Sequence, residues 1–305
     1  MDQRFERETS SVQELSFDQL KMFLEGTALK YNTLASSLQD DDGLYNNLAL
    51  LLSDQCPWQF VLVSKHYGTL RITQGSILVQ MMDILETINS VNPLRIIPGT
   101  VGPIRKFPRP AIRESILNAM IHCDYSQMLP IVIEYDDEIF SIVSPGGSWL
   151  SDRWVCNGME ARNEDLATIL LELDLIKLKG RGMFHIKDVY HRSGMVAAFT
   201  DNGSHFTVNL PSMTHPARNK DERRRRLKSI LENKRRIDVR TASRLLQSSP
   251  YASGEALEGL VDEGFAFSML RGGNRMYYLC DTGDKHFPIG LNDIKKQDTE
   301  TSSGG

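Results

Sequence analysis

The sequence is poor in cysteine. It has four in 305 residues, at Cys56, Cys123, Cys156 and Cys280, and no two are in Cys-x-x-Cys spacing. Cysteines this far apart indicate neither a zinc cluster nor the disulfide framework of a small secreted domain. The chain also lacks an apolar run of roughly 18 residues, the length that a membrane-spanning helix needs, and its first residues have no apolar signal-like segment. These absences predict a reduced, cytoplasmic protein with no membrane partner.

Several catalytic motifs are absent as well. The sequence contains no Gly-x-x-x-x-Gly-Lys-[Ser/Thr] loop and no His-Glu-x-x-His pair, so a P-loop helicase and a zinc hydrolase of that type are unsupported. We find no Ser-His-Asp or Cys-His arrangement that indicates a nucleophile. His185 and His191 are interpreted as surface or core residues. Whether the protein is an enzyme is therefore left open.

The overall composition is ordinary, but the charge is unevenly distributed. Hydrophobic residues make up 41% and charged residues 24% of the chain, which is typical of a globular protein, and 305 residues suggest about two domains. The segment from Pro216 to Leu246 contains twelve Lys or Arg residues and only four Asp or Glu residues. This segment carries a charge of +8 within a chain of net charge −4. Such asymmetry indicates an anionic partner, of which DNA is the most common.

The alternation of elements predicts an α+β domain over residues 16–212. Apolar and β-branched runs predict strands at 58–63, 69–73, 94–97, 131–135, 139–143 and 205–210. Periodic segments predict helices at 46–52, 75–88, 111–125, 164–173 and 184–191. Helices interspersed with antiparallel strands are typical of a sheet covered on one side. Residues 1–15 are polar and are expected to be extended or disordered, and the tail at 283–305 is expected to be disordered.

The pattern changes after residue 219. Helices are expected at 223–231, 239–246 and 253–262, followed by strands at 265–270 and 276–279 that a Gly-Gly turn joins into a hairpin. Three short helices followed by a basic hairpin resemble a winged helix-turn-helix domain, which we place at residues 219–282.

The most informative segment runs from Ala111 to Tyr125. Glu114, Asn118 and His122 recur every four residues there, so they form one polar row on a helix. A carboxylate can orient a water molecule, and an amide oxygen can bind a hard cation such as Mg²⁺. An amphipathic helix whose polar row only contacts water remains the alternative.

This polar row resembles the N-box helix of the GHKL (Bergerat-fold) ATPases. Its ending, His122-x-Asp124-Tyr125, resembles one branch, the RecG-like ATP-binding transcriptional regulators, which often follow a Schlafen-type AlbA-like domain. The resemblance extends over about residues 16–210. It implies ATP and Mg²⁺ as cofactors, with Glu114 as the catalytic base, Asn118 as the Mg²⁺ ligand and His122 beside the nucleotide.

Two glycine loops follow in the order that the family has. Ser144-Pro-Gly-Gly147 corresponds to its first glycine box and Gly180-Arg-Gly182 to the later one, while Arg162-Asn163 resembles an Arg-Asn-Pro segment. The resemblance therefore implies nucleotide contacts at Ser144, Gly146, Gly147, Gly180, Arg181 and Gly182. Glycine permits positive φ and close approach of the backbone, and N–H groups at a helix start can bind phosphate. Taken alone, each glycine pair reads as an ordinary turn.

Three departures from the family weaken the expectation of hydrolysis. Ser144 stands where GHKL ATPases have an adenine-binding Asp, Cys123 where the branch has Arg, and Lys177 where it often has Glu. Three functions stay open: a nucleotide-binding regulator that switches DNA affinity, a degenerate scaffold that acts through DNA or protein contacts alone, and, more weakly, an active ATPase with Glu114 as general base.

The C-terminal module also has two interpretations. As a DNA-binding unit it would use arginines and the start of the third helix; the expected contacts are Arg223, Arg224, Arg225, Arg226, Tyr251, Ser253, Arg271 and Arg275. However, the third helix carries four acidic residues and no Lys or Arg lies between Pro250 and Leu270, so phosphates would repel it. Binding to a protein is the alternative.

Two further questions stay open at this stage. The sequence does not determine whether the protein forms a homodimer. Phe5-Glu-Arg-Glu-Thr9 resembles the segment that follows the AlbA-like domain in the family. The resemblance therefore leaves open whether the chain is a fragment or a short form.

Overall fold

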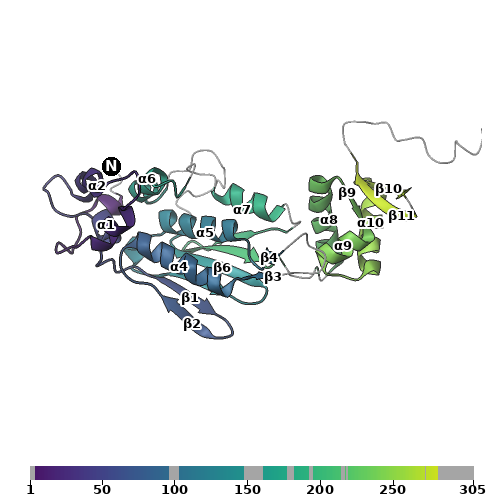
Figure 1. The fold of residues 1–305 in the computed structure, drawn as a ribbon, viewed down its shortest axis with the longest axis horizontal. Helices are drawn as coiled ribbons and strands as arrows, with labels where there is room; N and C mark the ends of the chain where they lie inside the picture. Colours follow the sequence, from purple (N-terminus) through teal and green to yellow (C-terminus); the bar gives the residue numbers. More distant parts are fainter. Residues whose placement is uncertain are drawn as a thin grey trace, which may run out of the picture.

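The computed structural model describes residues 4–95, 103–147, 161–176, 182–191, 195–213, 217, 219–271 and 273–280. Figure 1 shows a larger N-terminal part, built on a sheet, and a smaller C-terminal unit. The helices and strands confirm the predicted α+β class. None of the helices in these ranges is long and apolar enough to cross a membrane.

A mixed six-stranded sheet forms the centre of the N-terminal part. Its strands are β1 (Phe60–Ser64), β2 (Gly68–Ile72), β5 (Ile131–Tyr135), β6 (Ile139–Pro145), β7 (Ala198–Asp201) and β8 (His205–Pro211), in the order β2-β1-β5-β6-β8-β7. β1 and β5 are parallel, and every other neighbouring pair is antiparallel. A separate two-stranded ladder joins β3 (Leu94–Arg95) to β4 (Ile104–Arg105).

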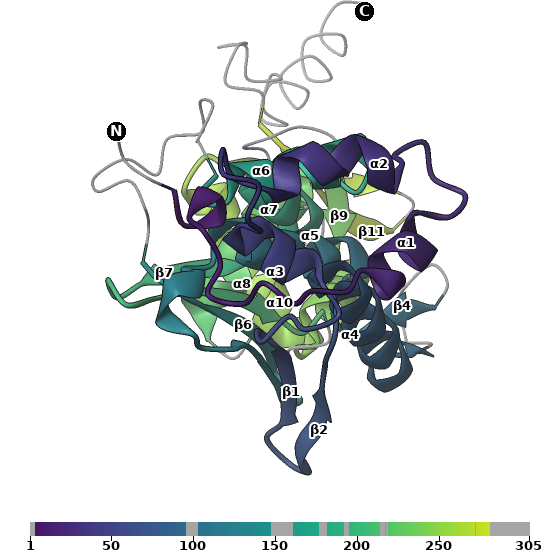
Figure 2. The same ribbon diagram turned by 90° about the vertical axis from the view of Figure 1, so that its left-hand side faces the viewer.

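Helices cover one face of this sheet, as the view in Figure 2 shows. The helices of this part are α1 (Asp18–Leu24), α2 (Tyr31–Leu34), α3 (Asn47–Leu52), α4 (Ile77–Val91), α5 (Arg109–His122), α6 (Glu164–Glu172) and α7 (Gly182–His191). Alternation along the strands explains the layering. Phe60, Leu62 and Ile133 point inward and are fully buried, whereas Val61 and Val132, on the other face, are half-buried.

The C-terminal unit has its own hydrophobic core. Its elements are α8 (Lys220–Lys234), β9 (Arg236–Asp238), α9 (Val239–Leu246), α10 (Pro250–Asp262), β10 (Ala266–Arg271) and β11 (Asn274–Leu279). The three strands form an antiparallel sheet in the order β10-β11-β9, and the expected hairpin is confirmed. Gly273, in its turn, has a φ of 79°, a conformation that favours glycine.

The expectation of disorder at residues 1–15 is wrong for residues 4–15. Phe5–Arg7 forms a short 3-10 helix, labelled η1, and the side chain of Glu6 is fully buried. Its partners lie about 160 positions further along the chain, so no local pattern could reveal them. β7 and β9 were also not expected, since both are too short to show a clear alternation. The predicted disordered tail, 283–305, lies outside the described residues.

Candidate functional site

Helix α5 carries the polar row. Its first turn and its buried face fix the position of the helix. Pro110 occupies the first turn, where its missing N–H costs nothing. Ile112, Ile116 and Ala119 share the face opposite the polar row and are buried, and α5 packs against strand β6 of the sheet. The predicted row of Glu114, Asn118 and His122 lies on the other side of the helix, and α7 packs along α5 there.

Asn118 lies directly against the first residue of α7. A Cβ atom at Gly182 would come within 2.5 Å of the Asn118 Oδ1 atom and 2.8 Å of its Cγ, so a larger residue here would force the Asn118 side chain or the start of α7 to shift. The Asn118 Nδ2 atom is buried and, among the described residues, has no hydrogen-bond partner. A buried unpaired donor costs about 1–3 kcal/mol. Such a group is a candidate for binding a ligand.

Glu114 lies one turn earlier on the same helix and faces α7 as well. Its Oε2 atom is 3.8 Å from Nδ1 of His185, whose side chain is half exposed. The carboxylate is largely shielded, with 18% of its side chain accessible. His185, interpreted from the sequence as a surface or core residue, is thus a surface residue that borders the polar row.

His122 lies near the C-terminal end of α5, close to Arg162. Burial, and secondarily the positive charge of Arg162, lowers the pKa of His122 from 6.5 to about 4. The imidazole is therefore neutral at physiological pH. It can donate or accept a hydrogen bond, but it does not supply a positive charge to a phosphate.

Arg162 connects the end of α5 to the first glycine loop. Its guanidinium forms an ion pair with Asp124 at 3.1 Å and donates to the carbonyl oxygen of Gly147 at 3.1 Å. Gly146 has a φ of 86°, and a Cβ there would lie 2.6 Å from the Cβ of Asp124. The loop is therefore held between Asp124, Arg162 and the turn at Gly203.

Ser144, the serine of the first glycine loop, is buried within the sheet. It lies on the inner side of β6, is 3% exposed, and its hydroxyl donates to the carbonyl oxygen of Phe206 at 3.4 Å. The side chain is engaged within the sheet. This position weakens the expectation that Ser144 contacts a nucleotide base.

The structure brings most of the predicted nucleotide-site residues into two neighbouring groups. Glu114, Asn118 and Gly182 lie between α5 and α7, and His122, Gly146 and Gly147 lie around Arg162. Gly180 and Arg181 lie outside the described residues. The sequence alone assigns no role to Arg162 and Asp124, because an ion pair between residues 38 positions apart leaves no local pattern.

Asn163 holds α6 against the end of α5. It is 1% exposed, and its Nδ2 atom donates to the carbonyl oxygens of Met120 and Cys123 at 3.2 and 2.8 Å. These carbonyls lie in the last turn of α5 or just after it and have no partner within the helix. The start of α6 thus positions both Arg162 and the polar row.

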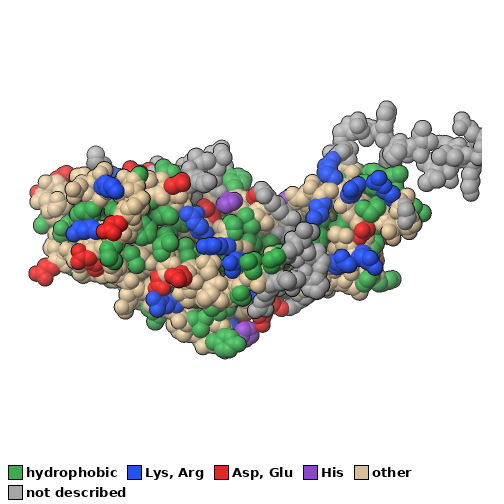
Figure 3. Space-filling view, in the orientation of Figure 1, with side chains coloured by type: hydrophobic (Ala, Val, Ile, Leu, Met, Phe, Trp, Pro, Cys, Tyr) green, Lys and Arg blue, Asp and Glu red, His purple; other side chains and the backbone are tan. Residues whose placement is uncertain are grey.

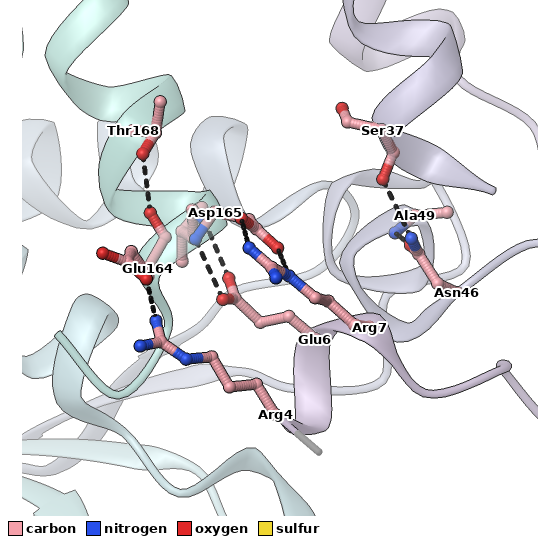
Figure 4. Close-up of polar contacts among 10 residues, drawn as sticks. Arg4, Glu6, Arg7, Ser37, Asn46, Ala49, Glu164, Asp165 and Thr168 are labelled. Atoms are coloured by element: carbon pink, nitrogen blue, oxygen red, sulfur yellow. Dashed lines mark hydrogen bonds and ion pairs between the residues drawn. The ribbon is translucent and has the colours of Figure 1, made fainter. Parts of the chain in front are cut away.

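The N-terminal segment in turn caps α6, as Figure 4 shows. The Glu6 carboxylate accepts hydrogen bonds from the backbone N–H groups of Asp165 and Leu166 at 3.0 and 2.8 Å. Arg7 pairs with Asp165 through two hydrogen bonds of 2.8 Å, and Arg4 pairs with Glu164. A carboxylate at a helix N-terminus binds free N–H groups and complements the helix dipole.

This capping carboxylate predicts a pH effect on stability. Burial raises the pKa of Glu6 from 4.5 to about 7, against the lowering effect of the two backbone donors and Arg4. Tyr125 and Asp165 also face it. Because the folded state holds the proton more tightly than the unfolded state, the contribution of Glu6 to stability falls as pH rises from 4.5 to about 7. The loss is up to about 3 kcal/mol.

Urea denaturation of the wild type and Glu6→Gln between pH 5 and 8 measures this effect. The stability of the wild type relative to the variant is expected to decline with rising pH. His122 acts in the opposite direction, since its lowered pKa favours the folded state as pH rises towards 6.5, but it is present in both proteins and cancels. A stability difference that is constant or increases with pH would contradict the assignment.

The predicted DNA-contacting residues are only partly accessible. Arg226 is 2% exposed and donates to the carbonyl oxygen of Leu245, and Ser253 is fully buried with its hydroxyl 2.6 Å from that of Ser248. Both residues therefore stabilise the fold, and their expected contact with DNA is wrong for this conformation. Tyr251, at the start of α10, is 82% exposed.

The remaining arginines divide into paired and exposed ones. Arg224 forms an ion pair with Glu263 at 3.1 Å and Arg275 with Glu258 at 2.7 Å. Arg223 is half-buried and donates to the carbonyl oxygen of Ala217. Arg225 and Arg271 are exposed. The basic charge counted in the sequence is thus partly neutralised within the unit itself.

Comparison with known proteins supports the fold class alone. No family model matches the chain, and no curated protein matches it. A solved structure that resembles it is that of the DIP2311 protein from Corynebacterium diphtheriae, a structural genomics target. The two share 21% identity with a TM-score of 0.58, over 91% of this chain and 64% of that one. This chain therefore spans less than two thirds of that protein's length, and at this identity the likeness concerns the fold.

Proposed function

We propose that the protein is a nucleotide-binding transcriptional regulator, with a GHKL-like ATP-binding domain coupled to a DNA-binding winged helix. The order helix, strand, helix, helix and hairpin from α8 to β11 supports a winged helix-turn-helix at residues 219–282. The mixed sheet with α5 on its covered face supports a GHKL-like domain at residues 16–212.

The observation that carries the proposal is the position of α7. Its first residue, Gly182, contacts the unpaired amide of Asn118, and its last residue, His191, contacts α8. The His191 Nε2 atom is 3.2 Å from the Glu232 carboxylate, and Asn233 donates to the His191 carbonyl oxygen at 3.2 Å. A helix of ten residues spans about 15 Å. A ligand that displaces the start of α7 therefore acts on the C-terminal unit at its other end.

The residues present fit ATP and Mg²⁺. Free N–H groups at the start of α7 can receive phosphate oxygens, and the Asn118 amide oxygen is a suitable ligand for a hard cation. In the part of the chain that the structure describes, no three His, Cys, Asp or Glu residues converge on a metal site. Mg²⁺ would therefore be held by Asn118, water and the nucleotide, and it would neutralise phosphate charge.

A degenerate scaffold that works without nucleotide is the second candidate. The engaged hydroxyl of Ser144 favours it, because the adenine-reading group of the family is then missing. An active ATPase with Glu114 as general base is the weaker alternative. It predicts hydrolysis that Glu114→Ala abolishes while nucleotide binding remains.

Calorimetry with ATP and a non-hydrolysable analogue, with and without Mg²⁺, tests nucleotide binding. We expect wild-type binding that depends on Mg²⁺ and that Asn118→Ala weakens by at least about tenfold, the effect of losing about 1.4 kcal/mol. Thr168→Ala on α6, where the hydroxyl donates to the Glu164 carbonyl oxygen, serves as the control and is expected to bind like the wild type. Absence of binding in the wild type would favour the degenerate scaffold.

Coupling between the two parts is tested by measuring DNA affinity with and without ATP. Binding energies are reciprocal, so DNA must change ATP affinity by the same factor. His191→Ala is expected to reduce this factor towards one while leaving ATP affinity in the absence of DNA unchanged. An unchanged coupling factor in this variant would show that α7 does not connect the nucleotide site to the C-terminal unit.

A further inference from the structure

Three acidic residues in α10 or directly after it form ion pairs with cations of the same unit. Glu255 pairs with Lys220 at 2.8 Å, and Glu258 accepts from both Arg275 and the Tyr277 hydroxyl at 2.7 Å. Glu263 receives Arg224 and Lys228 from α8 at 3.1 and 2.8 Å. These pairings lower the pKa values of the three carboxyl groups, so α10 keeps its negative charges at physiological pH.

This network makes α10 unsuited to the major groove of DNA. The helix that enters the groove must pass between two rows of phosphates. α10 offers carboxylates and no Lys or Arg there. Of its two predicted contacts, Ser253 is fully buried, and Tyr251 is exposed but carries no positive charge. Releasing Lys220, Arg224, Lys228 or Arg275 for phosphates would leave a carboxylate facing DNA without its partner.

Helix α9 presents the opposite chemistry. Arg240 and Arg244 are both exposed, lie four residues apart and share one face, while Ala242 and Leu246 on the other side are fully buried. Arg236, exposed on the edge strand β9, lies just before the helix. Among the described residues, no ion pair involves any of these three arginines. Figure 3 shows Lys and Arg side chains gathered over α9 and around β9.

The spacing of these arginines suits a row of phosphates. Arg240 and Arg244 are separated by about 6 Å along the helix axis, and four residues place the Cα atom of Arg236 no more than about 14 Å from that of Arg240. Guanidinium groups on long side chains can therefore reach neighbouring phosphates of one strand.

We propose that the C-terminal unit binds the phosphate backbone of duplex DNA through Arg236, Arg240 and Arg244, without reading base sequence through α10. This inference deepens the proposed function and rests on its DNA-binding part. It assigns phosphate contact to α9 and β9, whereas the sequence predicted contacts at Arg223 to Arg226, at Arg271 and Arg275, and at the start of the third helix. Affinity is then set by counterion release, which depends on salt and not on sequence.

Fluorescence anisotropy with two labelled duplexes of equal length and unrelated sequence tests the proposal across a salt series. The Arg240→Ala/Arg244→Ala variant is expected to bind both duplexes about tenfold more weakly or worse, with a salt slope lower by about two. Arg225→Ala/Lys234→Ala removes the same charge from exposed positions of α8 and is expected to change affinity by about threefold at most. Circular dichroism verifies that both variants fold.

Selection from a randomised duplex library provides the second measurement. We expect no enriched motif. An enriched motif that Tyr251→Ala abolishes would overturn the proposal, because it would return sequence reading to the start of α10. Unchanged binding by the α9 double variant would overturn this inference alone, whereas a wild type that binds neither duplex would also remove DNA binding from the proposed function.

Discussion

Replacing Gly146 with alanine is expected to lower the free energy of unfolding by about 2–4 kcal/mol. The position has a φ of 86°, which an L side chain rarely adopts. In addition, the new Cβ would lie 2.6 Å from the Cβ of Asp124 and 3.1 Å from an Nη atom of Arg162. The Cβ atom of Asp124 is bonded directly to the backbone, so side-chain rotation cannot move it away. The glycine loop or the backbone at the end of α5 must therefore move.

Gly203→Ala is the matched control for this effect. Gly203 has a φ of 83°, almost the same as Gly146, but a Cβ there would meet nothing within 4 Å. The loss of stability in Gly203→Ala should therefore be limited to the backbone cost of about 1–2 kcal/mol. The difference between the two variants in urea denaturation isolates the contact with Asp124 and Arg162. Equal losses would mean that the loop is not held there.

Gly182→Ala is expected to destabilise the protein by about 1–3 kcal/mol, because the added methyl group overlaps the Asn118 amide. The buried Asn118 amide or the start of α7 must then shift. On the proposed function, this movement also weakens ATP binding by at least about tenfold. Calorimetry measures the affinity, and urea denaturation measures the stability independently of any ligand.

A double-mutant cycle with Asn118→Ala tests the cause. Without the Asn118 amide, the methyl group at position 182 has space, and alanine is otherwise the better helix former. The stability cost of Gly182→Ala should therefore largely disappear in the Asn118→Ala background, giving a coupling energy of about 1–2 kcal/mol. Additive losses would show that the two residues do not meet, and the position of α7 against the polar row would need revision.

Local sequence patterns predicted the elements well. The four-residue spacing of Glu114, Asn118 and His122 predicted one helix face, and strands were predicted at 131–135 and 139–143; both predictions are confirmed. The α+β class and the C-terminal hairpin are confirmed as well. These predictions hold because helix and strand periodicities are properties of neighbouring residues.

The environment of individual charges was predicted poorly. Arg223 to Arg226 form one basic run in the sequence, yet one of them is buried, one is paired with Glu263, one donates to a backbone carbonyl and one is exposed. A helix distributes consecutive residues around its axis, and the neighbours that meet each face come from distant segments. A count of charges therefore overestimates the basic surface.

The sequence by itself determined where most of the helices and strands form, which residues share a face and where the net charge lies, because these follow from spacing and residue type. The tertiary structure alone decided that Glu6 caps α6, that Arg162 joins Asp124 to the glycine loop, and that Gly182 meets Asn118. Each of these contacts joins residues far apart in the chain. Such contacts depend on how the layers pack, and packing is specified by the whole core at once and not by any local pattern.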